Sequence, residues 1–127
     1  MRALVPITAA TLLLSCSAPP PSPPGMALAR ETTGRIAGPA KNCIPTNSSM
    51  NLHALDAETL AYGWGPTIYI NHLAGPCPGV DPQSTLIVVP NLGGEYCRGD
   101  RIRGREFGGS IPGPVCILND WVPYRRP

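Results

Sequence analysis

Four cysteines in the C-terminal part of the chain constrain its fold more than any other feature of the sequence. They are Cys43, Cys77, Cys97 and Cys116. The segment from Cys43 to the C-terminus is only about 85 residues long, and a domain of this size buries too little apolar surface to be stable without cross-links. Small exported proteins supply such cross-links as disulfides, whereas the cytoplasm keeps thiols reduced. We therefore expect an exported domain that is stabilised by two disulfide bonds.

Zinc binding is the other common use of four cysteines, here with His53 and His72 as additional ligands. Structural zinc sites place their cysteines in close C-x-x-C pairs, and the sequence has no such pair. We therefore favour disulfides over a metal site and expect no cofactor. His72 shares a strand face with Ile68 and Ile70, which favours a partly buried structural role.

The fifth cysteine, Cys16, ends an N-terminal segment that is typical of export. Arg2 precedes an apolar run over residues 3–14, which has the length of a signal-peptide core and is too short to span a bilayer as a helix. The run ends in Leu13-Leu14-Ser15-Cys16, which resembles a bacterial lipobox. The resemblance implies that residues 1–15 are removed as a signal peptide. It also implies that Cys16 carries a lipid that anchors the protein in a membrane.

Cleavage by ordinary signal peptidase is the alternative, and it would give a freely secreted protein. Its A-x-A signature is Ala27-Leu28-Ala29, but a proline-rich stretch separates these residues from the apolar run. We therefore favour the lipoprotein. Ser17 follows Cys16 at the position where aspartate would signal inner-membrane retention. Analogy with known sorting thus indicates the outer membrane, with the domain facing the periplasm.

Residues 16–41 are expected to form a tether that carries the lipidated cysteine. Residues 18–24 contain five prolines, which favours polyproline II, and no hydrophobic periodicity follows them. An ordered arm that lies on the domain is the alternative. The folded domain is expected over residues 42–127.

Residues 42–127 are expected to fold as an all-β domain. Apolar and polar residues alternate over residues 59–64, as in a strand with one buried face. Residues 85–89 form an apolar, β-branched run, which favours a strand covered on both faces. The expected strands lie at residues 50–54, 59–64, 67–73, 85–89, 95–106 and 115–118, with residues 121–124 extending or capping the last one. Five or six consecutive strands with short connections predict an antiparallel meander curled into a small barrel or sandwich.

The meander also predicts how the cysteines pair. Consecutive antiparallel strands alternate in direction, which places Cys43 and Cys97 at one end of the domain and Cys77 and Cys116 at the other. Bridged cysteines need Cα atoms within about 7 Å of each other. We therefore predict the disulfides Cys43–Cys97 and Cys77–Cys116 over the two other pairings that four cysteines allow.

Arginine recurs at every second position in Arg101, Arg103 and Arg105. On a strand these side chains would line one face, where they would contact lipid phosphates, lipopolysaccharide or a cleft lined by carboxylates. The alternative, which we favour, is an exposed edge strand that its charge keeps soluble and unpaired. The formal net charge of the chain is only +2, so we expect no nucleic-acid partner.

No set of residues in the sequence predicts catalysis. Gly109-Ser110 lies in a loop rich in glycine and proline and not in the G-x-S-x-G turn of a hydrolase. The acidic residues fall mostly at expected turns, where they solvate and cap the backbone. We therefore expect a non-enzymatic protein without catalytic residues.

The sequence around the four cysteines resembles a family of small exported bacterial proteins catalogued as a domain of unknown function. The matching segments are Cys43-Ile44, Gly75-Pro76-Cys77-Pro78-Gly79, Tyr96-Cys97-Arg98-Gly99-Asp100 and Pro112-Gly113-Pro114-Val115-Cys116-Ile117. The resemblance covers Cys43 to about Tyr124 and leaves out the tether. It implies a bacterial envelope protein, often anchored by a lipid, and it assigns no catalytic residue.

These features favour a non-enzymatic lipoprotein of the cell envelope, whose tethered β domain binds a partner or has a structural role. A small inhibitor of a hydrolase such as a lysozyme or protease is the alternative. In that case residues 107–114, flanked by Arg103 and Arg105, would enter the active site of the enzyme. A hydrolase with an unrecognised site is a third interpretation, which requires a concave pocket that holds His53 or His72 beside an acid.

Overall fold

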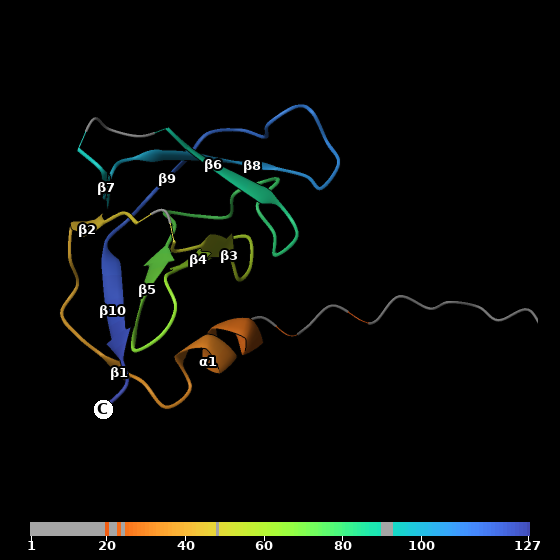
Figure 1. Cartoon of the computed structure of the whole chain (residues 1–127). Helices are drawn as coiled ribbons and strands as arrows, with labels where there is room; N and C mark the ends of the chain where they lie inside the picture. Colours follow the sequence, from red (N-terminus) through yellow and green to blue (C-terminus); the bar gives the residue numbers. More distant parts are fainter. Residues whose placement is uncertain (1–19, 21–22, 24, 48, 90–92) are drawn as a thin grey trace, which may run out of the picture.

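A computed structural model of the chain describes residues 20, 23, 25–47, 49–89 and 93–127 (Figure 1). These residues form one helix and ten strands, and all strand pairs are antiparallel. The elements are α1 (Met26–Thr32), β1 (Ile36–Ala37), β2 (Cys43–Pro45), β3 (Leu52–Ala54), β4 (Thr59–Tyr62), β5 (Thr67–His72), β6 (Thr85–Val89), β7 (Glu95–Cys97), β8 (Arg101–Arg105), β9 (Cys116–Ile117) and β10 (Trp121–Arg125).

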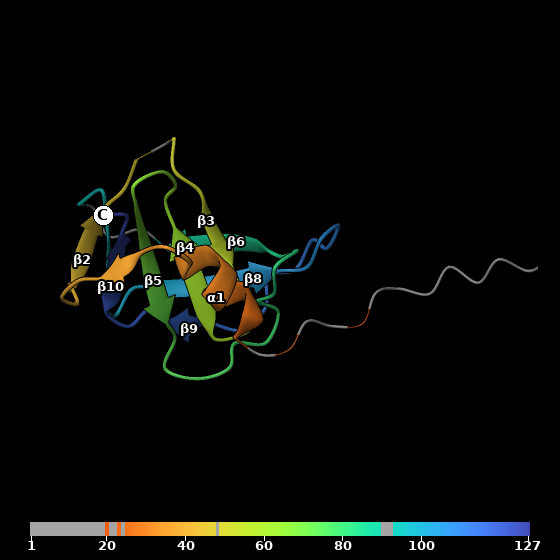
Figure 2. The same ribbon diagram turned by 90° about the horizontal axis from the view of Figure 1, so that it is seen from below.

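A five-stranded sheet of order β1-β10-β5-β4-β3 forms the middle layer of the fold. Two smaller sheets, β2-β7 and β6-β8-β9, cover one face of it, and α1 lies across β4 and β5 on the other (Figures 1 and 2). Alternation along β4 divides its side chains between the two sides. Leu60 and Tyr62 pack toward the small sheets, whereas Ala61 packs toward α1. All four residues of β4 are buried because both faces of this strand are covered.

The all-β class predicted from the sequence is confirmed, but the predicted barrel is wrong, because the sheets remain open. Strands β3, β4 and β5 form a meander, as expected, and β5 then pairs with β10 instead of β6. Strand β6 leaves this sheet and becomes an edge of the three-stranded sheet. Its ends, Thr85 and Val89, are exposed, so it is not covered on both faces as predicted.

The predicted strand over residues 95–106 is broken into β7 and β8, which belong to different sheets. Gly99 lies at the break with φ of 92°, a left-handed conformation that glycine adopts without steric cost. The carboxylate of Asp100 accepts a hydrogen bond from the backbone N–H of Cys97 at 2.7 Å and closes the turn. This bend lets one stretch of chain contribute to two sheets.

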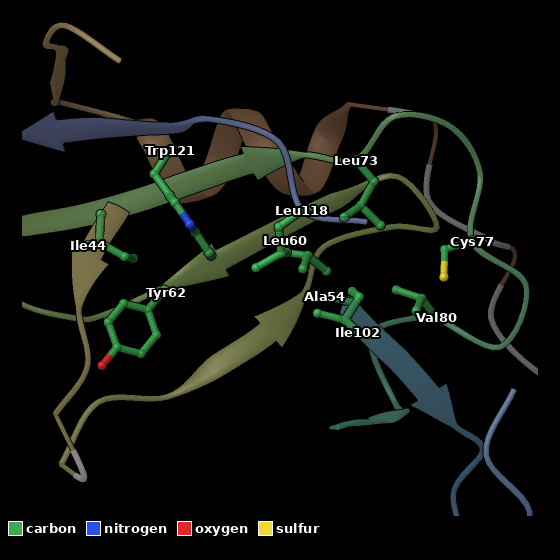
Figure 3. Packing of buried hydrophobic residues seen from close by; sticks show 10 residues of the cluster. All are labelled: Ile44, Ala54, Leu60, Tyr62, Leu73, Cys77, Val80, Ile102, Leu118 and Trp121. Carbon is green, nitrogen blue, oxygen red and sulfur yellow. The ribbon is translucent and has the colours of Figure 1, made fainter. Parts of the chain in front are cut away.

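The main core lies between the five-stranded sheet and the two small sheets (Figure 3). Aromatic side chains from three strands meet there: Tyr62 of β4, Tyr96 of β7 and Trp121 of β10. The ring of Tyr62 lies edge-on to the other two, at centroid distances of 5.4 Å to Tyr96 and 6.3 Å to Trp121. Burial and, to a lesser degree, the neighbouring Tyr62 raise the pKa of Tyr96. This cluster joins the β2-β7 sheet to the middle layer.

Both predicted disulfides are confirmed. Cys43 of β2 bonds to Cys97 of β7, with Cα atoms 4.0 Å apart, and Cys77 bonds to Cys116 of β9 across 5.9 Å. The four cysteines do not lie at the two ends of a single meander, however. Cys43 and Cys97 face each other as direct partners in a two-stranded sheet of their own. Disulfides of this kind are typical of proteins that fold in an oxidising, exported environment.

The N-terminal boundary of the domain predicted at residue 42 is wrong. Residues 26–31 are strong helix formers and build α1, from which Ala27 and Leu28 pack against the five-stranded sheet. Strand β1 then pairs with β10, and Lys41 exchanges two backbone hydrogen bonds with Trp121. The ordered arm, given as the alternative to a tether, is therefore correct from Met26 onward. The signal peptide and Cys16 lie outside the described residues.

Helix α1 also bears on two expectations about export. The A-x-A signature at Ala27-Leu28-Ala29 lies within this helix, so cleavage after Ala29 would remove its first half and the side chains that contact the sheet. Across the described residues, no helix has the length and hydropathy that would be needed to cross a membrane.

Replacing both Cys77 and Cys116 by alanine is expected to lower the free energy of unfolding by about 4 kcal/mol, because the unfolded chain then gains conformational entropy. The two cysteines are 39 positions apart. Urea unfolding followed by tryptophan fluorescence measures the change. Reductant should shift the midpoint of the native chain but not that of a variant lacking all four cysteines. Equal urea midpoints for the double variant and the native chain would show that the Cys77–Cys116 disulfide does not stabilise the fold.

Candidate binding surface

The three arginines predicted to share a face do so on β8. Burial alternates along this strand, so that Ile102 and Gly104 face the core while Arg101, Arg103 and Arg105 face outward. Strand β8 is flanked by both β6 and β9. The charges therefore stand on the central strand of a sheet, and the interpretation that we favoured, in which they protect an exposed edge, is wrong.

Apolar side chains surround these arginines. Across β6, Arg101 faces Val89 and Arg103 faces Ile87, and on β9 the partner of Arg101 is Ile117. Val89 is 45% exposed and Ile117 is 42% exposed. The ion pairs between described residues involve none of the three arginines. We call this mixed cationic and apolar surface of β6, β8 and β9 the arginine face.

The connection between β8 and β9, residues 106–115, extends the arginine face beyond the sheet and projects from the molecule (Figure 1). We call it the binding loop. Phe107 is 88% exposed and Ile111 is 83% exposed, the two highest values among the large hydrophobic residues described. Val115, at the end of the loop, is 49% exposed. Side chains of this kind rarely face water together unless they contact something.

Backbone contacts fix the base of the binding loop. The backbone N–H of Gly113 donates to the carbonyl of Gly104 at 2.7 Å, and the Nε of Arg103 donates to the carbonyl of Gly113 at 2.8 Å. A turn inside the loop is closed by Gly109, whose N–H donates to the carbonyl of Glu106 at 2.9 Å. The disulfide at Cys116 follows directly. Arg103 thus positions the loop through its hydrogen bond to Gly113. Arg101 and Arg105 remain as the candidate contacts for an anionic group.

Gly104 allows the segment around Gly79 to lie directly on β8. A Cβ atom at position 104 would overlap the carbonyl group of Gly79 and would lie 2.8 Å from the backbone nitrogen of Val80. Gly113 is similarly crowded, since a Cβ there would come within 2.9 Å of the carbonyl oxygen of Pro78. Three backbone segments therefore meet without side chains between them, and this contact sets the direction in which the loop leaves the sheet.

A hollow of about 420 Å³ lies at the base of the loop. Its lining residues are mostly glycine and proline, with Glu106 and Ser110 as the polar members: Pro78, Gly79, Gly104, Glu106, Gly109, Ser110, Ile111, Gly113 and Pro114. A serine nucleophile needs a positioned base, and the described lining of this hollow contains no histidine beside Ser110. What the described lining offers is a concave shape with few side chains, in which backbone polar groups are accessible.

The hydrolase interpretation required a pocket with a histidine beside an acid, and the structure contains one. His53 Nε2 lies 4.0 Å from the Glu31 carboxylate, in a shallow hollow of about 290 Å³ that Arg30 also lines. The other described lining residues are Ala27, Ala54, Leu55 and Pro82. Glu31 was not among the predicted site residues, because residues 16–41 were assigned to the tether.

His72 is exposed, contrary to the partly buried role predicted for it, while Ile68 and Ile70 are buried. Its Nδ1 lies 3.4 Å from the hydroxyl of Thr59. Among the described residues, one group of three potential metal ligands is close enough to share an ion, namely Cys43, Cys97 and Glu95. Both sulfurs in this group belong to a disulfide and are therefore unavailable as thiolate ligands.

The close approach at Gly104 leads to a stability prediction. Gly104→Ala is expected to lower the free energy of unfolding by about 2 kcal/mol or more, because overpacking against backbone cannot be relieved by a rotamer change. Gly75→Ala is the matched control, since a Cβ there meets nothing within 4 Å, and its effect should stay within about 0.5 kcal/mol. Chemical denaturation compares the two variants. Equal stabilities would show that the Gly79 segment does not rest on β8.

Comparison with protein-family models found no match to this chain, and searches of curated proteins and of solved structures found none either. The resemblance of the cysteine contexts to a family of exported bacterial proteins therefore remains a prediction. What the surface is able to bind has to be inferred from its own residues.

Proposed function

We propose that this chain is a non-enzymatic protein of the bacterial cell envelope that binds a partner through the binding loop and the arginine face. A lipid on Cys16 would hold it at the outer membrane, on the periplasmic side. The resemblance of residues 13–16 to a lipobox supports the anchor. The two disulfides support an exported location.

The concentration of exposed apolar side chains on one surface carries the proposal. Eight large hydrophobic residues are exposed in the described chain, and five belong to the binding loop or the arginine face: Val89, Phe107, Ile111, Val115 and Ile117. Aromatic residues and arginine are enriched at protein interfaces, where they supply most of the binding energy. A loop whose base is already fixed loses little conformational entropy on binding.

The chemistry of the surface favours a partner with an apolar cleft bordered by carboxylates. Phe107 and Ile111 would fill the cleft, and Arg101 and Arg105 would pair with the acidic rim. Active sites of hydrolases are concave, and those of glycosidases carry carboxylates. Inhibition of a hydrolase such as a lysozyme or protease is therefore the second candidate function, and the projecting loop is the observation that favours it.

The third candidate is a hydrolase whose site contains His53 and Glu31. Their proximity supports it, and the absence of a nucleophilic side chain from the described lining of that hollow weighs against it. A His53→Ala variant separates this candidate from the others. It should leave partner binding through the loop unchanged, whereas it would abolish a hydrolytic activity that depended on the imidazole.

Partner binding provides the main test. The purified chain, immobilised and exposed to a panel of muramidases and serine proteases, should bind at least one of them in a salt-sensitive manner. Phe107→Ala with Ile111→Ala should weaken this binding at least tenfold, because it removes the two apolar anchors. Arg101→Glu with Arg105→Glu should weaken binding mainly at low salt. Ile36→Ala, at an equally apolar but distant exposed site, is the control.

Failure of the loop variant to weaken binding would place the contact on another surface. Arg103 is deliberately left unchanged in this test because it holds the loop by its bond to Gly113. A variant at Arg103 would mix loss of charge with loss of loop geometry.

The anchor has a separate test. Intact mass of the native protein from a bacterial envelope should correspond to residues 16–127 with added acyl chains, and reduction should add the mass of four hydrogens for two disulfides. Globomycin, which blocks the lipoprotein signal peptidase, should cause the precursor to accumulate. A Cys16→Ala variant should not be acylated, because it lacks the thiol to which the lipid would be attached. A mature protein that begins after residue 29 would contradict the lipid anchor and favour secretion.

A further inference from the structure

Strand β6 is the longest edge strand among the described residues, and it lacks the features that protect edges. It spans Thr85–Val89, whereas the other edge strands of the described sheets are two or three residues long. Among the described residues only β8 pairs with it. Its register with β8 is unbroken from Thr85 to Val89, so no bulge twists the edge away.

Natural sheets prevent pairing at exposed edges with charges, proline, bulges or very short strands. Strand β6 contains no charged residue and no proline. The arginines that would serve this purpose lie one strand further in, on β8, where they protect no edge. An unprotected edge with a β-branched sequence is a template for another strand.

We infer that β6 pairs with β6 of a second copy of this chain, antiparallel and about a two-fold axis at Ile87. In an antiparallel pair, residues that direct their backbone groups toward the partner must face residues that do the same. Such residues alternate along a strand, so a two-fold axis between identical strands has to pass through a residue position. Ile87 is the middle of the five residues, and this register pairs all of them.

The side chains of β6 fit this pairing with themselves. On the outer face Ile87 would meet its own copy, and Thr85 would meet Val89, giving pairs of β-branched residues that pack well across strands. Leu86 and Val88, which already contact the core, would lose part of their remaining exposure. No charged side chain would meet its own copy on these two strands, which removes the main obstacle to symmetric pairing.

The arginines do not oppose this arrangement. The two β8 strands would be three strand spacings apart, or about 14 Å, which exceeds the Debye length of about 8 Å at physiological salt. A two-fold axis normal to the sheet keeps both arginine faces on the same side. The product is a six-stranded sheet, β9-β8-β6-β6-β8-β9, that presents two binding loops in one direction.

Strand pairing over five residues buries less than the roughly 1,000 Å² typical of stable interfaces. We therefore expect a weak dimer, whose population rises steeply between about 10 μM and about 1 mM in a sedimentation-equilibrium series. Confinement to a membrane surface would raise the local concentration of the chain and favour the same pairing.

The two-fold axis at Ile87 makes the test specific. The full chain, expressed with its own N-terminal segment and held in a mild detergent, should dimerise, whereas Ile87→Lys and Ile87→Glu variants should each remain monomeric, with affinity at least tenfold lower. A one-to-one mixture of these two variants should dimerise again, because opposite charges then face each other at the axis. Ile117→Lys places the same charge on the same face at the far strand and should dimerise like the native chain.

Three outcomes would overturn the inference. The first is a native chain that sediments as a monomer over the whole range, and the second is dimerisation of the single-charge variants as strong as that of the native chain. The third is a mixture of the two variants that fails to restore the dimer although circular dichroism shows both to be folded. Each result would leave the test of partner binding valid, because that test changes Phe107 and Ile111 of the loop and does not depend on the oligomeric state.

Discussion

The contact between the backbone of Gly79 and that of Gly104 is the constraint on which the three-stranded sheet and the binding loop depend. It brings the segment that follows Cys77 onto β8, and the same approach places Cys77 within bonding distance of Cys116 at the start of β9. The binding loop leaves the sheet between these two fixed points. A side chain at position 104 would separate the layers, and the exposed Phe107 and Ile111 would lose their defined position.

Local patterns in the sequence were sufficient to predict much of this surface. The alternation of Arg101, Arg103 and Arg105 predicted their shared outward face. The correct disulfide pairs were predicted from the directions of the strands, although the predicted order of the strands in the sheet was wrong. The pairing of β5 with β10 was out of reach, because it joins segments about fifty residues apart and only tertiary packing selects it.

Helix α1 was missed for a different reason. Seven residues are too few to give a clear helical period, and the prolines before Met26 suggested an extended tether. The helix is stabilised by the sheet face that it covers, where Ala27 and Leu28 pack against a cluster of buried residues from this side of the sheet. This misassignment also concealed the proximity of Glu31 to His53. The arginines of β8 were assigned to an edge strand because the sequence does not show which strands lie beside β8 in the sheet.

The layer order separates the binding surface from the N-terminal helix. The chain enters the fold at α1, which lies on the opposite side of the five-stranded sheet from β6, β8 and β9 (Figures 1 and 2). The arginine face and the N-terminal helix are therefore on opposite sides of the middle layer, and a partner bound at the arginine face would not meet α1. Edge pairing through β6 about an axis normal to the sheet would preserve this arrangement, with both arginine faces on one side of the dimer and both α1 helices on the other.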